Sequence, residues 1–252
     1  MSSIISVKDL CKTFSLKGYN NEVLKNVSLE MEEGEFVSVM GPSGSGKSTL
    51  LYTVSGMDSV TSGSVSFGGK EISAMKKKEL TSVRLHEMGF IFQQMYMMIK
   101  LCIFDNIVLP GYQAGKDRNA VNSRATELMR SLDIEDIGTR EISEVSGGQL
   151  QRACICRALI NEPKVVFADE PTGALNSKAA NEVMKQLRKI NNSGTGIMMV
   201  THSIRVAAQS DRVIYLVDGN IMGELCMGRM QSDEELAQRD QTLNSWLMSQ
   251  GW

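Results

Sequence analysis

Gly41-Pro42-Ser43-Gly44-Ser45-Gly46-Lys47-Ser48-Thr49 is the stretch around which the rest of this chain is organised. Its glycines allow successive backbone N–H groups to turn inward around an anion. The helix that we expect from Ser48 to about Ser55 adds its N-terminal donors and the positive end of its dipole. The pattern G-x-x-x-x-G-K-[ST] is that of a phosphate-binding loop. We therefore expect a bound nucleotide, with Lys47 on the β- and γ-phosphate oxygens and the Ser48 hydroxyl on Mg²⁺.

Three apolar segments predict buried strands, and each strand is followed by residues that could bind or act on a ligand. Residues 36–40 lead into the phosphate loop, residues 165–168 end at Asp169-Glu170, and residues 197–200 end at Thr201-His202. In open α/β sheets, ligands bind at the carboxyl ends of the strands. The three endings are therefore expected to converge on one nucleotide.

The N-terminal region has the alternation of half-buried strands. Residues 4–7 and 27–31 alternate, and the polar loop expected at residues 17–21 between them predicts an antiparallel pair. Residues 65–69 indicate a second, short hairpin. Phe14, near the end of the first strand, is either a core residue or a side chain that stacks on a purine.

The middle of the chain predicts a helical insertion at roughly residues 94–160. It follows a buried strand at residues 89–92, which ends at Gln93. The Met-rich run at residues 95–104 comes next, and it is either core of the insertion or an adaptable groove for a partner. Ser146-Gly147-Gly148-Gln149 opens a later helix, whose exposed N-terminal donors make a second anion site.

The C-terminal residues 226–252 form a separate helical extension in this interpretation. Residues 232–235, Ser-Asp-Glu-Glu, have the pattern of a capping box. Leu236, Leu243, Trp246 and Leu247 can share one face of the helix that follows, so we expect this helix to pack back on the domain.

Composition narrows the class of protein. The chain has 252 residues, 42% of them apolar, which suits one core with a sizeable insertion. A net charge of −2 does not show the excess of basic residues that is typical of proteins that bind nucleic acid, so we expect no nucleic-acid partner. No uncharged apolar run reaches ~18 residues, the start of the chain does not have the pattern of a signal peptide, and the five cysteines contain no C-x-x-C. We expect a cytosolic protein with reduced thiols.

Taken together, these motifs resemble those of the ATP-binding subunits of ABC transporters over about residues 4–225. In that family, residues 41–48 correspond to the Walker A loop, Gln93 to the Q-loop glutamine and residues 145–149 to the signature. Residues 165–170 correspond to Walker B with its following glutamate, residues 174–176 to the D-loop and His202 to the switch histidine. The resemblance implies a P-loop NTPase core of α/β class and ABC type, with N-terminal antiparallel β strands and a helical insertion subdomain.

The resemblance also implies roles for single residues. The adenine-stacking aromatic of the family falls on Phe14. Glu170 would polarise the attacking water, His202 would hold the γ-phosphate, and Asp169 and Gln93 would join Ser48 at Mg²⁺. Ser146 to Gln149 would bind ATP from across a head-to-tail homodimer. Two positions depart from the family pattern: Val145 replaces the usual Leu, and Asn176 replaces the D-loop Asp, which puts the coupling between the two ATP sites in question.

Within the family, two branches fit. Residues 89–94 and 168–175 are similar to the lipoprotein-release and macrolide-export ATPases. Residues 174–177, 217–221 and 246–252 are more similar to the antimicrobial-peptide resistance ATPases of the bacitracin-resistance (BceA-like) type. That branch implies a partner permease that is one large chain with an extracellular domain, and a peripheral location at the cytoplasmic face of the membrane. Two rivals are a cell-division-type signalling ATPase and an ABC protein of ribosomes or DNA repair, although the latter usually carries two ATPase halves or a long coiled coil.

Overall fold

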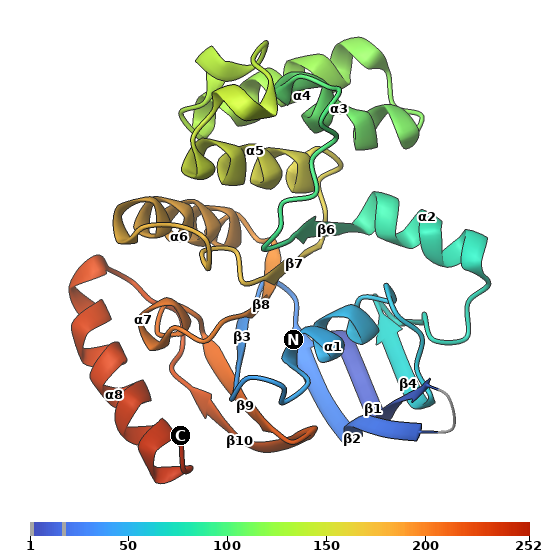
Figure 1. Cartoon of the computed structure of the whole chain (residues 1–252), viewed down its shortest axis with the longest axis vertical. Helices are drawn as coiled ribbons and strands as arrows, with labels where there is room; N and C mark the ends of the chain where they lie inside the picture. Colours follow the sequence, from blue (N-terminus) through green and yellow to red (C-terminus); the bar gives the residue numbers. More distant parts are fainter. Residues whose placement is uncertain (1–2, 17–18) are drawn as a thin grey trace. The chain divides into compact units, whose positions relative to one another are not determined.

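The computed structural model describes residues 3–16 and 19–252 and divides the chain into two compact units (Figure 1). The first unit comprises Met1–Leu80 and Gly196–Trp252, and the second unit comprises Thr81–Thr195. Both units contain strands and helices, as expected for an α/β protein. The predicted boundaries, with a helical subdomain at about residues 94–160 and an extension from residue 226, stay a prediction.

One sheet of the first unit has the strand order β2-β1-β4-β5, and its neighbouring strands are all antiparallel. Its strands are β1 (Ser3–Leu16), β2 (Tyr19–Glu32), β4 (Ser62–Phe67) and β5 (Lys70–Glu71). The predicted antiparallel pair and the hairpin at residues 65–69 are thereby confirmed. The predicted loop at residues 17–21 is wrong in part, because Asn20 and Asn21 continue the pairing of β2 with β1. Lys17 and Gly18 lie outside the described residues.

The other strands of the first unit have the order β10-β9-β3-β8. They are β3 (Phe36–Met40), β8 (Gly196–Val200), β9 (Arg212–Val217) and β10 (Asn220–Cys226). β3 is parallel to both of its neighbours, β8 and β9, whereas β10 is antiparallel to β9. Every residue of β3 and β8 is buried, which explains why both strands are continuous apolar runs with little alternation. The strands predicted at residues 36–40 and 197–200 are confirmed.

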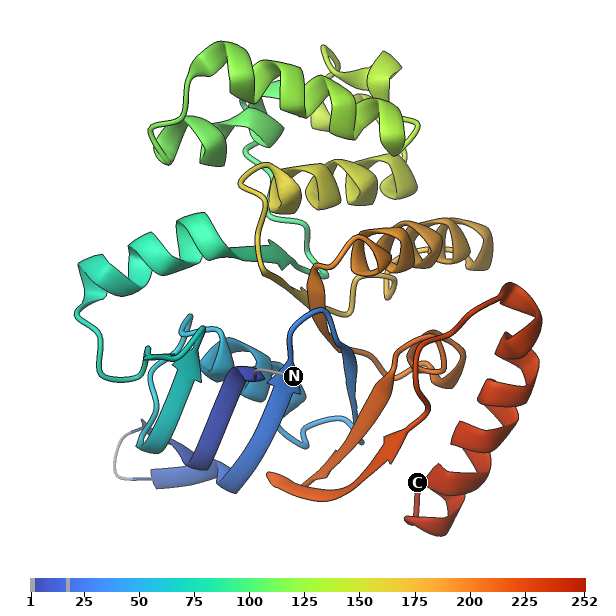
Figure 2. The same ribbon diagram turned by 180° about the vertical axis from the view of Figure 1, so that it is seen from behind.

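Helices accompany the strands of the first unit. They are α1 (Lys47–Val54), α7 (Ile204–Ala207), the 3-10 turn η3 (Asp233–Glu235) and α8 (Leu236–Ser249). Figures 1 and 2 show α8 running alongside β9 and β10. Leu243 and Leu247 are fully buried in a cluster with Met40 and Tyr215, and Trp246 packs against the same cluster. The tail helix therefore packs back on its unit, as the apolar spacing predicted.

The predicted capping box at Ser232–Glu235 is wrong. The Ser232 side chain makes no capping hydrogen bond, and α8 begins only at Leu236. The Glu235 carboxylate instead accepts a hydrogen bond from the backbone N–H of Gln231. Arg239 holds the helix in place, because the residue is 8% exposed and its guanidinium donates to the carbonyl oxygens of Ala208 and Ser210 at 2.8 and 2.6 Å.

In the second unit, two parallel strands lie among helices. β6 (Met88–Ile91) pairs with β7 (Val165–Asp169), and both were predicted from their apolar runs. The helices are α2 (Lys77–Glu87, which begins in the first unit), α3 (Ile103–Gln113), α4 (Arg118–Ser131), α5 (Gly147–Leu159) and α6 (Ser177–Asn192), with 3-10 turns η1 (Glu135–Ile137) and η2 (Ile142–Glu144). α3, α4 and α5 pack on one another, so most of the region from residue 103 to residue 159 is helical, as expected. The prediction is wrong for residues 94–102, which form turns and irregular backbone.

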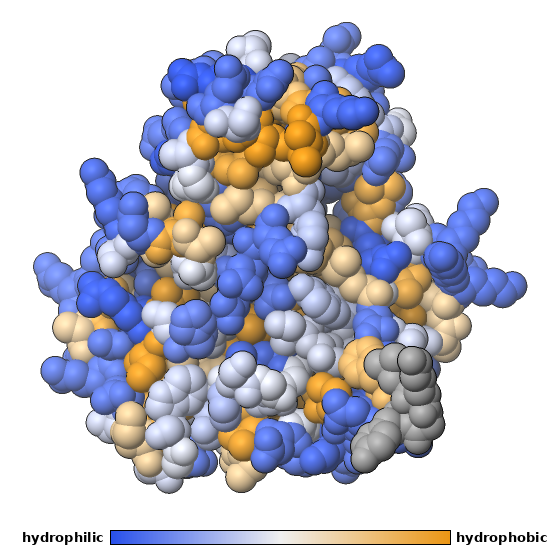
Figure 3. Space-filling view, viewed as in Figure 1, coloured by the Kyte–Doolittle hydropathy of each residue, from blue (hydrophilic) through white to orange (hydrophobic). Residues whose placement is uncertain are grey.

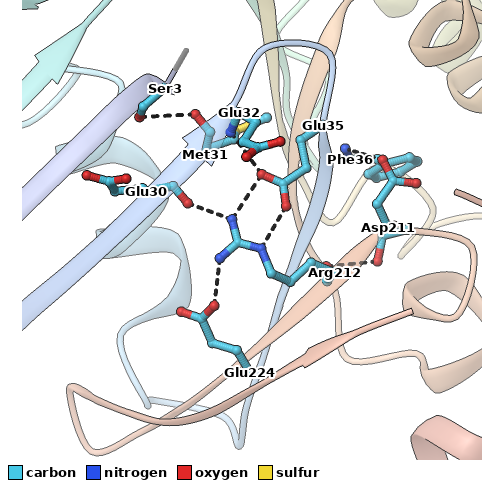
Figure 4. A network of polar contacts seen from close by, with 10 residues as sticks. Ser3, Glu30, Met31, Glu32, Glu35, Phe36, Asp211, Arg212 and Glu224 are labelled. Carbon is cyan, nitrogen blue, oxygen red and sulfur yellow. Dashed lines mark hydrogen bonds and ion pairs between the residues drawn. The ribbon is translucent and has the colours of Figure 1, made fainter. Parts of the chain in front are cut away.

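A charged network fastens the strands of the first unit at the end opposite the phosphate loop (Figure 4). The Arg212 guanidinium binds both carboxylate oxygens of Glu35, at 2.7 and 3.0 Å, and one oxygen of Glu224 at 2.6 Å. It also donates to the carbonyl oxygen of Glu30 on β2. Burial alone would lower the pKa of Arg212, but the hydrogen bonds to Glu35 and Glu224 outweigh it and raise the pKa. One cation thus links β2, β9 and β10.

Removing this cation is expected to destabilise the fold. Arg212→Met keeps an unbranched apolar stem but removes the guanidinium, and so leaves the Glu35 and Glu224 carboxylates without their cation in a site where the arginine side chain is only 12% exposed. We expect a loss of about 2–4 kcal/mol in the free energy of unfolding, measured by urea denaturation. The control is Arg130→Met, which breaks a similar pair with Glu135 on the exposed surface. Equal losses in both variants would contradict a special role for the Arg212 network.

Candidate functional site

The phosphate loop joins β3 to α1 and is shaped by glycines with left-handed backbone. Gly44 has a φ of 80° and Gly46 a φ of 100°, conformations that side chains disfavour. A Cβ on Gly46 would lie 2.9 Å from the carbonyl oxygen of Val23, so the loop also needs glycine there for space. Lys47 folds back over this loop, and its ammonium donates to the carbonyl oxygens of Gly41 and Pro42 at 2.9 and 2.7 Å.

The N-terminus of α1 is suited to an anion. Gly46 is its N-cap and supplies no side-chain hydrogen bond, and the first turn, with Lys47, Ser48 and Thr49, holds no acidic residue. The first N–H groups of a helix have no partner within the helix, and its dipole is positive at this end. Ser45 is 2% exposed, and its hydroxyl has no hydrogen-bond partner among the described residues. A buried hydroxyl of this kind fits a phosphate oxygen as its partner.

His202 lies at the neighbouring strand end in the same unit. The parallel register pairs Val39 of β3 with Val200 of β8, and the backbone N–H of Thr201 donates to the carbonyl of Val39 at 3.2 Å. The residues that follow these strands, the phosphate loop and His202, therefore leave the same edge. Phe14 also belongs to the first unit, on β1, and this residue is 39% exposed.

The acidic residues lie in the second unit. β6 and β7 are parallel, with Ile91 opposite Ala168, so Gln93 and Glu170 both follow shortly after paired residues. A Cβ added to Gly173 would lie 3.0 Å from Glu170 Oε2 and 3.2 Å from Gln93 Nε2. Both side chains therefore lie next to Gly173, which leaves space for them because glycine has no side chain.

Glu170 has an unusual backbone conformation. Its φ of 44° is left-handed, which costs a residue with a Cβ about 1–3 kcal/mol. The backbone N–H of Gly173 donates to the Glu170 carbonyl at 3.0 Å and closes the turn. Asp169, directly before it, is 8% exposed. Carboxylate, amide and hydroxyl oxygens are the ligands that Mg²⁺ takes, so Asp169 and Gln93 of the second unit and Ser48 of the first unit are each of a type that can bind this ion.

The signature residues cap α5. Ser146 Oγ accepts from the backbone N–H of Gln149 at 3.3 Å, and the Gln149 side-chain oxygen accepts from that of Ser146 at 2.9 Å. These residues border a groove of about 480 Å³ in the second unit. The groove is lined by Ser146, Gly147, Gly148, Arg152, Ala174, Leu175, Asn176, Lys178, Ala179 and Glu182. A Cβ on Gly148 would lie 3.2 Å from the Ala179 methyl group, so a side chain there would crowd the start of α6.

Asn176 has a structural role that sequence reasoning missed. It is the N-cap of α6, and its side-chain oxygen accepts from the backbone N–H of Ala179 at 2.9 Å. Asn and Asp cap helices about equally well. The replacement of the usual acid by Asn176 therefore keeps the cap while removing its charge.

The site residues expected from the sequence are divided between the two units. The first unit holds residues 41–49, Phe14 and His202, and the second holds Gln93, residues 146–149, Asp169 and Glu170. Sequence reasoning gave no separate role to Gly173, although this residue lies within the run 168–175, and it did not single out Lys12, whose ammonium lies over the Phe14 ring. The fold and these site residues define the class, a P-loop ATPase.

Comparison with known proteins identifies the family. The ABC transporter family matches residues 24–173. The lipoprotein-releasing system ATP-binding protein LolD of Aquifex aeolicus is 41% identical over 89% of this chain and 99% of that protein. The bacitracin export ATP-binding protein BceA of Halalkalibacterium halodurans is 40% identical over 90% of both chains. The dimeric post-hydrolysis structure of the ATP-binding cassette MJ0796 of Methanocaldococcus jannaschii, bound to ADP and Pi, is 36% identical over 90% of this chain and all of that one, with a TM-score of 0.84.

This chain belongs to the ABC transporter family, as an ATP-binding and ATP-hydrolysing cassette. The finer placement in the bacitracin-resistance branch is not singled out, because the lipoprotein-releasing and bacitracin export relatives are equally similar. No helix among the described residues is long and apolar enough to cross a membrane.

A substitution of Ser45 tests whether this residue of the phosphate loop serves ligand binding at the expense of stability. Ser45→Ala removes a buried hydroxyl that has no partner in the described residues. We expect the nucleotide-free protein to keep its stability or gain up to about 1 kcal/mol, since an unpaired buried hydroxyl is unfavourable. ATP affinity, measured by calorimetry, should fall by roughly fivefold or more because one hydrogen bond to phosphate is lost. Unchanged affinity would show that this hydroxyl is no phosphate ligand.

Proposed function

We propose that this cassette is the ATPase subunit of a two-component transporter and drives a separate membrane permease. The observation that carries this proposal is an ordered, exposed apolar loop that begins two residues after Gln93. It places a surface suited to a partner beside a residue of the proposed active site.

The roles proposed for the site residues follow from the chemistry of each group. Lys47 exchanges its two carbonyl partners for β- and γ-phosphate oxygens, and the N–H groups of residues 44–49 surround the phosphates. His202 holds the γ-phosphate. Phe14 stacks on adenine with the exposed part of its ring. Ser48, Asp169 and Gln93 would hold Mg²⁺, which neutralises charge on the phosphates when bound.

Hydrolysis then needs one base. Glu170 orients a water and accepts its proton as the water oxygen attacks the γ-phosphorus. The bond between that phosphorus and the bridging oxygen breaks, and ADP leaves with the electron pair. The left-handed backbone of Glu170 and the small Gly173 beside it give the carboxylate its place.

We further propose a head-to-tail homodimer. The relative MJ0796 has been solved as a dimer with ADP and Pi. In this chain, the groove of the second unit lies next to Ser146 and Gly148, at the N-terminus of α5. The backbone N–H groups of this helix N-terminus could bind the phosphates of an ATP that is held by a second copy of the chain. Gln149 contributes through its hydrogen bonds with Ser146, which fix the geometry of this terminus.

Glu170→Gln tests the role of the base. The amide fills the same space beside Gly173 but cannot accept a proton, so turnover should fall by about 10²–10⁴ while ATP still binds. ATP should then accumulate a dimer visible by size-exclusion chromatography. Glu127→Gln, on the exposed face of α4, is the control and should behave as wild type. Near-normal turnover in Glu170→Gln would remove this residue from the mechanism.

The proposed docking surface is the exposed apolar loop, residues 95–101. Tyr96, Met98 and Ile99 are 61%, 54% and 83% exposed. Large apolar side chains that lie together on a surface mark interaction sites. Figure 3 shows apolar side chains gathered on the helical part of the second unit. The alternative interpretation of residues 95–104 as core fits only their end, where Ile103 is fully buried.

Hydrogen bonds from the helices hold this loop in one shape. The Arg157 guanidinium of α5 donates to the carbonyl oxygens of Met95 and Tyr96 at 2.6 and 2.7 Å. The Asn106 side chain accepts from the N–H of Met98 at 2.7 Å and donates to its carbonyl at 3.2 Å. Met95 and Tyr96 both have positive φ values, of 61° and 44°. A loop held this firmly loses little entropy when it binds a partner.

The Cys154 thiol adds one more contact to the loop, with its sulfur 3.5 Å from the carbonyl oxygen of Met95. Burial raises the pKa of Cys154 to about 11, so at neutral pH the thiol keeps the proton that it donates.

For the transported substrate, we propose antimicrobial peptides, with export or detoxification as the outcome. Residues 174–177, 217–221 and 246–252 support this branch, and so does the bacitracin export relative. The partner would then be one large permease with an extracellular domain, and this subunit would bind at the cytoplasmic face of the membrane. Lipoprotein release is the second candidate, favoured by the relative LolD; a macrolide-export role or a cell-division-type signalling role would use the same ATPase chemistry.

Met98→Glu tests both the surface and the branch. A carboxylate buried against an apolar partner without a counter-ion is strongly unfavourable. We therefore expect loss of co-purification with the permease and loss of resistance to bacitracin-like or lantibiotic peptides in a complemented deletion strain. ATPase activity of the free subunit should stay unchanged, because Met98 is not part of the nucleotide site.

Met222→Glu is the matched control, since Met222 is 56% exposed but lies on β10 of the first unit. It should bind the permease and restore resistance. If both variants behave alike, the docking surface is wrong. If the deletion strain mislocalises lipoproteins and keeps its peptide resistance, the second candidate function replaces the first.

A further inference from the structure

Lys12 on β1 is a buried cation that the phosphate chemistry does not use. Its side chain is 7% exposed, and its ammonium donates to Asp58 Oδ1 at 2.8 Å and to the Ser59 carbonyl at 2.7 Å. A buried ammonium is costly unless it is paired. One carboxylate and one carbonyl would suffice to explain a structural lysine, but the same ammonium makes a third contact.

The third contact is with Phe14. The Lys12 ammonium lies over this ring, 4.7 Å from its centroid, within the range of a cation–π interaction. Residues 12 and 14 lie two apart on one strand, where side chains share a face. Phe14 is 39% exposed, so part of this residue is open to a flat ligand. A cation on one face of the ring fixes the ring's orientation for a ligand on the other.

The anion that binds Lys12 belongs to the segment that leaves α1. The N–H groups of Met57 and Asp58 both donate to the carbonyl of Tyr52 on α1, at 2.8 and 3.0 Å. α1 begins at Lys47, in the phosphate loop. Lys12 therefore joins the strand that carries Phe14 to the helix whose other end faces the phosphates.

Two further hydrogen bonds fasten the same strand to this segment. The N–H of Thr61 donates to the Cys11 carbonyl at 3.0 Å, and the N–H of Thr13 donates to Thr61 Oγ1 at 2.9 Å. Hydrogen bonds of the residues before and after Lys12 thus help to fix the distance between the Phe14 ring and the phosphate loop.

We propose that Lys12 is a positioning residue for the purine base: it holds one face of Phe14 and sets the distance of that ring from the phosphate loop. This inference rests on the proposed stacking of adenine on Phe14. It predicts that Lys12 contributes to affinity for the base of the nucleotide and not for its phosphates.

The experiment compares MgATP with magnesium tripolyphosphate, which has the phosphates but no base, by isothermal titration calorimetry. The variants are Lys12→Met, Phe14→Ala and their combination. We expect Lys12→Met to weaken ATP binding about three- to tenfold and Phe14→Ala to weaken it about tenfold, with tripolyphosphate affinity nearly unchanged in both. In the Phe14→Ala background, Lys12→Met should cost nothing further.

Three controls separate positioning from folding. Lys8→Met removes an exposed lysine from the same strand and should bind as wild type. Lys12→Arg keeps the cation and should retain most of the affinity. Lys12→Gln keeps a donor for Asp58 without the charge, and it serves if Lys12→Met does not fold.

The outcomes distinguish the two proposals. If Phe14→Ala leaves ATP affinity unchanged, base stacking on Phe14 is wrong. If Phe14→Ala weakens ATP but Lys12→Met does not, only the role of Lys12 is wrong. Equal losses for ATP and tripolyphosphate in Lys12→Met, or an undiminished loss in the Phe14→Ala background, would overturn positioning in favour of a general structural role.

Discussion

Close approach of backbones around the phosphate loop is the constraint on which the first unit depends. A Cβ on Gly41 would lie 2.0 Å from the carbonyl oxygen of Leu216, and one on Gly219 would lie 2.4 Å from that of Val23. A Cβ on Gly46 would lie 2.9 Å from the same Val23 carbonyl oxygen. The loop therefore approaches both β2 and β9 closely, and the N–H of Gly219, in the turn after β9, donates to the Ser45 carbonyl at 3.1 Å. Glycine is needed at these positions because a side chain there would collide with a backbone carbonyl oxygen.

In the second unit, the proposed active site depends instead on a strained backbone. Glu170 accepts an unfavourable backbone conformation, and the buried strand β7 behind it supplies the rigidity that maintains it. Asp169 and Glu170 are consecutive, but Asp169 is the last residue of β7 whereas Glu170 has the left-handed backbone. The two roles proposed for them, Mg²⁺ ligand and general base, therefore fall on residues with different backbone conformations.

What could be predicted from the sequence is what depends on short-range pattern. The strands at residues 36–40 and 197–200 are continuous apolar runs because both of their faces are buried, and the phosphate loop has fixed spacing. Contacts between distant residues could not be predicted: Lys12 finds Asp58, 46 positions away, and Arg157 finds Met95, 62 positions away. The predicted capping box at Ser232–Glu235 was wrong for a different, local reason: the Glu235 carboxylate accepts a hydrogen bond from the backbone N–H of Gln231, four residues before it.

One helix of the second unit connects two of the proposed functions. α5 begins at the signature residue Gly147, and near its other end Arg157 holds the carbonyls of the exposed apolar loop. A hydrogen-bonded helix moves as a rigid body, so a displacement of the loop by a partner would be transmitted to the signature end. Gln93 lies two residues before the same loop and adjoins Gly173 together with Glu170. The segment that would bind a permease is therefore tied by short covalent and hydrogen-bonded links to both parts of the second unit that would meet ATP.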